Sequence, residues 1–349
     1  MLTMTSREIV RRAIHFRTPP RLPVSFGALG VSDFAWFPRQ DTPEERERST
    51  AQRIDIWGCR WEATDVPNMG QVKGHPLADP HDLSGLIVPD YTDDRRYASA
   101  LEALEKAEAD GRYIVSGIFM VLVERLEALL GFENLFAGLL DADTRSDLER
   151  LTDIIADTHV TLVQETSRRF PGRIHGWNMS DDWGTQTAAF VSFDLWMDFF
   201  FPRYKRIFNA MHAAGCDVWV HSCGKVNEII EGYIQAGVNV VNLQQPRALG
   251  IREIGERYRG RIAFESLADI QHTLPTGNPA AIEADARDLG EHWALSTGGL
   301  VFSDYGDGRA IGVKDDSAKR IMYDAFSRVS QNLYGQPLPP PRVPPEEHP

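Results

Sequence analysis

The chain has 349 residues and a formal net charge of −13, with no basic tract. This charge opposes binding to nucleic acid or to an anionic membrane surface, so both are excluded as partners. Its three scattered cysteines, Cys59, Cys216 and Cys223, indicate a reducing compartment rather than a disulfide scaffold. The charged amino-terminal segment is unlike a signal peptide, and no apolar run is long enough to cross a bilayer. We therefore expect a cytoplasmic protein.

The first part of the chain predicts two helices, one strand and two irregular segments. Residues 5–14 have a capping residue and one apolar face, and residues 42–55 begin with the helix-start sequence Thr-Pro-Glu-Glu. A short strand is expected over residues 22–26. The glycine- and aromatic-rich residues 27–40 predict a long loop or lid. Residues 56–89, rich in Gly and Pro, predict an irregular excursion with short strands.

From residue 95 onward, helical segments alternate with short apolar runs. The expected strands cover residues 113–119, 173–179, 217–221, 238–243, 261–265 and 300–303. The expected helices cover residues 95–109, 120–138, 143–170, 193–214, 224–236, 250–258, 279–294 and 315–333. Such alternation is typical of parallel strands joined by helices, and no glycine-rich dinucleotide motif follows a strand. We therefore predict a single α/β domain, a (β/α)8 TIM barrel over residues 1–335, with a Pro-rich disordered tail over residues 336–349.

Side chains that can perform chemistry gather at the predicted carboxyl ends of the strands, where barrel enzymes place their active sites. They are Asp181, Asp182, His221, Cys223, Glu265, Asp304 and Asp307. In a barrel, all of them would face one mouth. The alternative interpretations are a solvated loop or a cap for the following helix for the Asp-Asp pair, and a surface residue for Glu265.

His221 and Cys223 are two residues apart at the end of an expected strand, so their side chains point to the same side. An imidazole nitrogen and a thiolate are two of the three protein ligands that a catalytic Zn²⁺ needs. Asp307 lies between two glycines and is the preferred third ligand. Cys59, in the irregular excursion, is another candidate, and Cys216 is a poor one. The structural alternatives are a core histidine, a buried thiol and an Asp-Gly turn.

Several short sequence motifs are distributed along nearly the whole chain. They are Thr5-Ser6-Arg7-Glu8, Asp181-Asp182-Trp183-Gly184-Thr185-Gln186, Phe201-Pro202-Arg203-Tyr204-Lys205, His221-Ser222-Cys223-Gly224, Asp269-Ile270-Gln271 and Gly298-Gly299-Leu300-Val301-Phe302. Together they resemble the uroporphyrinogen decarboxylase (URO-D) superfamily. This superfamily contains decarboxylases of haem synthesis and zinc-dependent methyltransferases that act with corrinoid proteins. The resemblance implies a (β/α)8 barrel.

The resemblance is closer to the methyltransferase branch. His221-Ser222-Cys223-Gly224 is similar to the zinc motif of that branch, whereas the Arg-Gln-Ala-Gly-Arg-Tyr motif of the decarboxylases is missing from the sequence. The methyltransferases carry Gly-Cys-Gly in the last strand loop, where this chain has Gly306-Asp307-Gly308. An aspartate in this place keeps the ligand charge, and its harder oxygen donor would leave zinc a stronger Lewis acid.

We therefore expect a zinc-dependent methyltransferase that acts on a small-molecule substrate, with a corrinoid carried by a partner protein or with a small methylated substrate. His221, Cys223 and Asp307 are the expected metal ligands, and Asp182 and Glu265 the expected catalytic residues that position substrate or move protons. One alternative is a cofactor-independent decarboxylase of a carboxylated substrate. Another is a non-catalytic barrel that binds a tetrapyrrole or a partner protein through its aromatic segments, residues 34–37 and 57–61.

Overall fold

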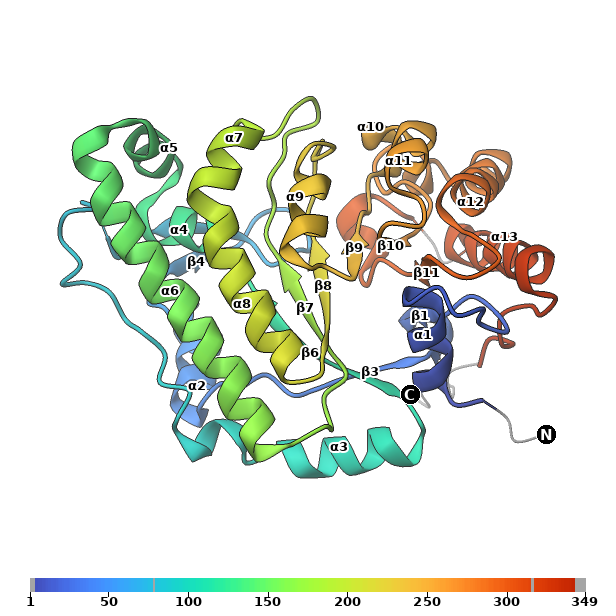
Figure 1. The fold of residues 1–349 in the computed structure, drawn as a ribbon, viewed down its shortest axis with the longest axis horizontal. Helices are drawn as coiled ribbons and strands as arrows, with labels where there is room; N and C mark the ends of the chain where they lie inside the picture. Colours follow the sequence, from blue (N-terminus) through green and yellow to red (C-terminus); the bar gives the residue numbers. More distant parts are fainter. Residues whose placement is uncertain (1–3, 78, 315–316, 343–349) are drawn as a thin grey trace.

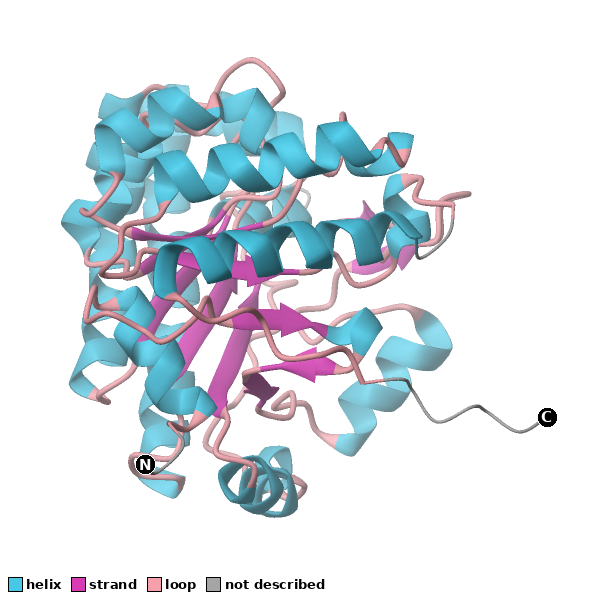
Figure 2. Cartoon of the chain, turned by 90° about the vertical axis from the view of Figure 1, so that its right-hand side faces the viewer, coloured by secondary structure: helices cyan, strands magenta, loops and turns pink. Residues whose placement is uncertain are grey.

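The centre of the protein is a nine-stranded sheet that curls into a nearly closed barrel, with helices on its outside (Figures 1 and 2). The computed structural model describes residues 4–77, 79–314 and 317–342. The strand order is β2-β1-β11-β10-β9-β8-β7-β6-β3, and all neighbours are parallel except β1 and β2. The strands of this sheet are β1 (Val24–Phe26), β2 (Val31–Ser32), β3 (Phe34–Trp36), β6 (Tyr113–Phe119), β7 (Gly176–Ser180), β8 (Asp217–His221), β9 (Val240–Asn242), β10 (Ala263–Ser266) and β11 (Leu300–Ser303).

Helices connect most of the parallel strands and cover the outer surface of the sheet (Figure 2). They are α1 (Ser6–Ile14), α2 (Pro43–Gln52), α3 (Ala100–Ala109), α4 (Val123–Leu130), α5 (Phe132–Leu140), α6 (Ala142–Arg169), α7 (Phe193–Leu195), η3 (Trp196–Phe200), α8 (Phe201–Ala213), α9 (Ile229–Ala236), α10 (Pro246–Leu249), α11 (Ile251–Tyr258), α12 (Pro279–Trp293) and α13 (Ser317–Tyr334). Short 3-10 turns are η1 (Gly27–Leu29), η2 (Asp94–Tyr97), η4 (Leu274–Thr276) and η5 (Gly308–Ile311). Within the described ranges, no helix combines the length and the apolar character of a membrane span.

The predicted parallel, helix-connected sheet is confirmed in its coarse form, as a mixed α/β fold with a barrel-like sheet. The predicted excursion contains an antiparallel hairpin of β4 (Arg60–Glu62) and β5 (Gln71–Gly74). The prediction of a loop over residues 27–40 is wrong at two places, because β2 and β3 both lie within it. The first pairs antiparallel with β1, and the second pairs in parallel with β6. Segment β3 is only three residues long, which is too short to show the alternation of apolar and polar residues that is typical of strands. It becomes a strand because it pairs with a neighbouring strand.

The barrel closes at Asp33 rather than through a full hydrogen-bonded ladder. Among the described residues, no ladder joins β3 to β1. Instead, the N–H of Asp33 donates to the carbonyl of Val24 (2.7 Å), and its carbonyl accepts from the N–H of Tyr113 (2.9 Å). The Asp33 carboxylate also accepts from the N–H of Val24 (2.9 Å) and from both terminal nitrogens of Arg21 (2.7 Å each). One buried aspartate therefore ties β1 to the opposite edge of the sheet.

The inside of the barrel has its own small apolar cluster. It consists of Val10, Ile14, Tyr113, Val115, Trp219, Val240, Ala263 and Val301. The first two come from α1, which packs against β6, β10 and β11 at the amino-terminal ends of the strands. The much larger second cluster fills the space between the strands and the outer helices. α1 thus closes the end of the barrel that is opposite to the predicted mouth.

The Pro-rich segment after α13 differs from its prediction as a disordered tail over residues 336–349. Residues 336–342 lie against the barrel, where Leu338 is buried and the N–H of Arg342 donates to a carbonyl of the β1–β2 connection (3.0 Å). The extended backbone that proline imposes is here held by side-chain packing and hydrogen bonds. Residues 343–349 lie outside the described part of the chain.

The closure at Asp33 gives a test of stability. We expect Asp33→Ala to lower the free energy of unfolding by about 3 kcal/mol, because it leaves the Arg21 guanidinium, whose side chain is only 11% exposed, without its carboxylate partner. Urea denaturation measures this change. Glu8→Ala is the matched control, since it removes an exposed i,i+4 ion pair and should cost no more than about 0.5 kcal/mol. Equal losses in the two variants would show that Asp33 does not close the barrel.

Candidate metal centre

The two-residue period of the strands places polar residues directly above the apolar interior. Trp219 of β8, Val240 of β9 and Ala263 of β10 are neighbours in the sheet and belong to the interior cluster. Two positions further along these strands stand His221, Asn242 and Glu265, which are again neighbours in register. Because side chains at i and i+2 point to the same side, the row of polar residues also faces the barrel axis. This row forms the carboxyl-terminal mouth.

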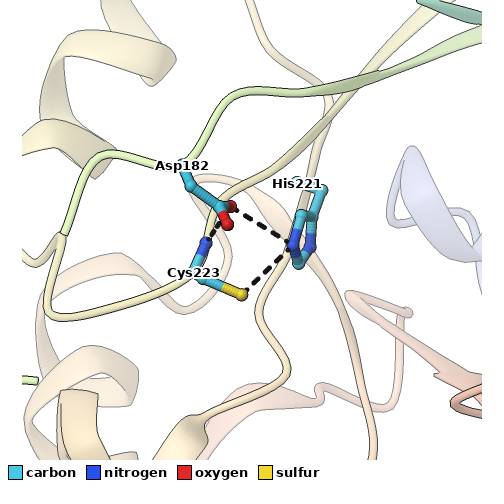
Figure 3. Close-up of side chains that lie close together, drawn as sticks. All are labelled: Asp182, His221 and Cys223. Atoms are coloured by element: carbon cyan, nitrogen blue, oxygen red, sulfur yellow. Dashed lines mark hydrogen bonds and ion pairs between the residues drawn. The ribbon is translucent and has the colours of Figure 1, made fainter. Parts of the chain in front are cut away.

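His221, Cys223 and Asp182 form one group of potential metal ligands (Figure 3). His221 Nε2 lies 3.4 Å from Cys223 Sγ and 3.4 Å from Asp182 Oδ1. One ligand atom from each residue lies within 4.8 Å of the others, and no other such group of three occurs among the described residues. The His221 side chain is 17% exposed and that of Asp182 is 38% exposed, so the group is open to solvent on one side.

Asn242 determines which imidazole nitrogen faces this group. Its Oδ1 lies 2.7 Å from His221 Nδ1. An amide oxygen can only accept, so Nδ1 carries the hydrogen and Nε2 has the lone pair. The Asn242 amide in turn donates to Glu265, whose carboxylate is buried. Burial raises the pKa of Glu265, and the hydrogen bond from Asn242 partly offsets this effect. The series of hydrogen bonds from His221 through Asn242 to Glu265 therefore orients the Nε2 atom of His221 toward Asp182 and Cys223.

Two loops must meet closely to bring Asp182 beside Cys223. Oδ1 of Asp182 accepts from the N–H of Cys223 (2.7 Å). Gly224 has φ +84°, and a Cβ added there would lie 2.1 Å from the carbonyl oxygen of Gly184. A side chain at position 224 would thus push the two loops apart. The Asp-Asp-Trp-Gly and His-Ser-Cys-Gly motifs are therefore the two sides of a single contact.

Asp181 has a different role from its neighbour, Asp182. Its fully buried carboxylate accepts from the N–H groups of Leu122, Val123 and Glu124 at the start of α4, at 2.8–3.0 Å. It also accepts from the hydroxyl of Tyr204. Asp181 therefore caps α4, which precedes it in the chain, and not the following helix that the cap interpretation named.

Negative charge dominates the surroundings of the group. Burial, followed by the charges of Asp182 and Asp181, raises the pKa of Glu124 to about 9. Burial and the charge of Asp182 also raise the pKa of the Cys223 thiol. Among the described residues, the charges that contribute most to these two shifts are those of carboxylates. A cation at this position would relieve the repulsion and favour the thiolate.

Asp307, the predicted third ligand, does not belong to the group. Its carboxylate accepts from the backbone N–H of Arg309 (3.0 Å) and forms two hydrogen bonds with the Arg309 guanidinium (2.9 and 2.7 Å). These bonds lower the pKa of Asp307 to about 2. Asp307 caps the turn η5, as the Asp-Gly alternative predicts. An arginine two residues away satisfies this carboxylate locally, and Asp182 is the carboxylate that lies with His221 and Cys223 among the described residues.

The remaining cysteines and the last strand end also lie apart from the group. Cys59 is buried beside Arg125 (3.7 Å to Nη1), and burial raises its thiol pKa to about 12. Cys216 is buried at the amino-terminal end of β8, and burial likewise raises its pKa to about 12. Asp304 forms a buried ion pair with Lys319 (3.0 Å).

A cavity of about 760 Å³ adjoins the group. It lies at the carboxyl ends of β3, β6 and β7 and is covered by residues of the excursion. The two predicted aromatic segments meet here, since Trp36, Phe37, Trp57 and Trp61 all line it. Ser180 belongs to its lining and is also the register neighbour of His221. The cavity and the group of ligands therefore share one mouth.

Sequence reasoning missed Asn242 and Glu124. Asn242 ends an apolar run, as His221 does, and the same two-residue period that places His221 could have found it. Glu124 carries no such signal, because it approaches Asp182 from a helix that is distant in the sequence.

No protein-family model matches the chain, and no curated protein matches it by sequence. Among solved structures, it is similar to a methyltransferase from Methanosarcina mazei, with a TM-score of 0.62 and 16% identity over 91% of this chain and 99% of that chain. A D-psicose 3-epimerase determined with D-fructose gives a TM-score of 0.38 and 13% identity over 67% of this chain and 83% of that one. A 2,3-dimethylmalate lyase gives 0.39 and 10% identity over 99% and 93%. At these identities the similarity to the methyltransferase shows a shared fold.

Proposed function

We propose that this chain is a cytoplasmic, zinc-dependent methyltransferase with a (β/α)8 barrel of the URO-D superfamily, acting with a corrinoid carried by a partner protein or with a small methylated substrate. The observation that carries the proposal is the group of Asp182, His221 and Cys223 at the mouth. The similarity to a methyltransferase along 99% of that protein's chain supports it. Asp182 takes the ligand position that the sequence suggested for Asp307.

The donor atoms fit a zinc ion. Ligands bound at about 2.0–2.3 Å to a tetrahedral ion are themselves about 3.3–3.8 Å apart. The two distances from His221 Nε2, to Cys223 Sγ and to Asp182 Oδ1, are both 3.4 Å. One nitrogen, one sulfur and one oxygen ligand leave a fourth position for substrate, which is the composition of catalytic rather than structural sites.

Each residue has a defined task in this proposal. Asn242 and Glu265 keep Nε2 of His221 unprotonated and oriented toward the ion, so Glu265 is a positioning residue. Asp182 binds the ion and holds the backbone of Cys223. Bound at this position, zinc would supply Lewis-acid polarisation of an ether or alcohol oxygen, or activation of a thiol acceptor.

The decarboxylase alternative predicts a basic pocket at the mouth. The cavity lining contains three arginines. Two of them are already paired, Arg39 with Asp41 (3.3 Å) and Arg125 with Asp55 (2.8 Å). The guanidinium of Arg53 donates to a backbone carbonyl (3.1 Å). This balance of charges favours methyl transfer over decarboxylation of a carboxylated substrate.

The first prediction from the proposed function concerns the metal ligands. Protein purified without chelator should contain about one zinc per chain, and Asp182→Ala or Cys223→Ala should weaken zinc binding by at least about 100-fold, since each removes one ligand of three. Elemental analysis and competition with a chromogenic chelator measure these changes. Asp307→Ala is the matched control and should keep wild-type affinity. Loss of zinc in Asp307→Ala with retention in Asp182→Ala would restore the assignment made from the sequence.

The second prediction concerns the residues behind His221. Asn242→Leu removes the acceptor of the Nδ1 hydrogen, so the affinity for zinc should fall by about 10–100-fold. Glu265→Gln keeps the size of the side chain and should have a smaller effect in the same direction. A cobalt-substituted enzyme provides the second measurement, because its visible spectrum reports ligand geometry. Ser25→Ala, in another strand, is the control. An unchanged affinity in both variants would contradict the positioning role.

The third prediction concerns the reaction. With methylcobalamin as donor and a small thiol as acceptor, the methyl group moves to sulfur, the thiol proton is released, and the electron pair of the cobalt–carbon bond stays on cobalt. The zinc-loaded enzyme should accelerate this change in the cobalamin spectrum, and removal of the metal or Cys223→Ala should reduce the rate by at least about 100-fold. A rate that is indifferent to the metal would refute the proposed function.

A further inference from the structure

We propose that Gly117 makes room in the cavity beside the metal group for a flat aromatic ring, and that this glycine determines which ligands the cavity accepts. Gly117 lies inside β6 and lines the cavity of about 760 Å³. A cavity of this volume is within the range of small-molecule sites. The binding of the ring does not depend on an ion. Only the assignment of the ring to a substrate rests on the proposed function.

Gly117 is exposed although it lies in the interior of the sheet. Strand β6 pairs with β3 on one side and with β7 on the other. Residues 113–116 and 118 of this strand are buried, whereas Gly117 and Phe119 are exposed. Both of these residues line the cavity. The surface that Gly117 exposes therefore contributes to the cavity wall.

The backbone of β6 does not itself require a glycine at this position. Glycine weakens a strand, and it is usually found there at a bulge, in a left-handed conformation, or where another chain segment or a ligand comes close. The pairing of β6 with β7 is continuous from Val115 to Phe119, so there is no bulge. The φ angle of Gly117 lies outside the left-handed region. A conformational reason for the glycine is thus excluded.

Packing does not require this glycine either. A Cβ at position 117 would lie 3.6 Å from Cζ3 of Trp36 and 3.7 Å from the carbonyl oxygen of Asn178, which are ordinary contacts. Gly176 in the neighbouring strand is different, because a Cβ there would lie 2.6 Å from the Tyr113 hydroxyl oxygen and 2.9 Å from Trp219 Nε1. The fold therefore needs Gly176 but would accept a side chain at position 117. The close approach of a ligand remains as the reason for Gly117.

The side chains next to Gly117 indicate the class of this ligand. Trp36, whose indole lies beside the open face of Gly117, is 60% exposed, and Phe119 is 41% exposed. The ring of Trp61 lies 6.1 Å from that of Phe119 and also lines the cavity. Large apolar side chains lose contact with water when a flat apolar molecule packs against them, and aromatic rings favour aromatic partners. The structure therefore indicates an aromatic ligand.

The position of Gly117 also fits a substrate of the metal group. Phe119, two residues further along β6, is the register neighbour of Ser180, and Ser180 is the register neighbour of His221. Neighbouring strands are about 4.8 Å apart, so two steps across the sheet span about 10 Å. A ring that rests on Gly117 would thus present a substituent on a short arm to the group of metal ligands.

Isothermal titration calorimetry of the full-length chain tests the class of ligand. The probes are 2-naphthylmethanol and its saturated analogue, decahydro-2-naphthylmethanol, which carry the same arm and differ only in their rings. We expect the aromatic probe to bind at least about 10-fold more tightly, because a flat ring can lie against both the glycine backbone and the indole of Trp36. Equal affinities would overturn the proposal.

The variant Gly117→Val tests the role of the glycine. The valine fills the space beside Trp36, so it should weaken binding of 2-naphthylmethanol by at least about 10-fold. The unfolding temperature should stay the same or rise, because valine favours strands. Gly27→Val, at an exposed position outside the cavity lining where a Cβ meets nothing within 4 Å, is the control and should leave binding unchanged. Unchanged binding in Gly117→Val, or a marked fall in its unfolding temperature, would refute the proposed role.

Elemental analysis of the same samples distinguishes this inference from the proposed function. Wild type and Gly117→Val should contain equal amounts of zinc, since no metal ligand is among the atoms nearest to position 117. Zinc in a protein that does not bind 2-naphthylmethanol would refute the inference alone. Tight binding of 2-naphthylmethanol by a protein that takes up no zinc would support the ring site and refute the proposed function.

Discussion

The hydrogen bond between His221 and Asn242 is the contact on which the candidate site depends. At 2.7 Å it fixes the hydrogen on Nδ1 and leaves Nε2 to face Cys223 and Asp182. It exists because β8 and β9 pair in parallel with these two residues in register. The register of these two strands therefore determines the tautomer of His221, a proposed metal ligand. Glu265 extends the same row by one strand.

A second constraint is the close approach of two loops. Gly224 meets the backbone of Gly184, and this contact carries the Asp182 carboxylate to the backbone of Cys223. The result is a set of carboxylates and a thiol in which burial and the charges of Asp182 and Asp181 raise the pKa of Glu124. Repulsion between these groups raises the free energy of the folded protein, and a bound divalent ion would lower it. The cost provides a physical reason to propose that the site binds metal.

Much of the fold follows from local pattern. The alternation of apolar runs and helices predicts the parallel strands. Of the two capping candidates for the first helix, Thr5 and Ser6, the structure has Thr5, and α2 begins after Thr42 as its sequence predicts. Strand β3 and the packing of residues 336–342 escape such reasoning, because both depend on neighbours that are distant in sequence. In each case, a short segment with little preference of its own takes its structure from the surface that it meets.

The sequence by itself predicted that His221 and Cys223 stand side by side, from their spacing of two at the end of an apolar run. The strand β8 ends at His221, and Cys223 lies just beyond it with its Sγ 3.4 Å from His221 Nε2. Only the tertiary structure decided which aspartate joins them. Asp182 and Asp307 both follow strands and both adjoin loops at the mouth. Arg309 engages Asp307 within its own turn, whereas the contact between two loops brings Asp182 to the imidazole. Local sequence cannot distinguish the two, because the difference lies in which backbone each loop packs against.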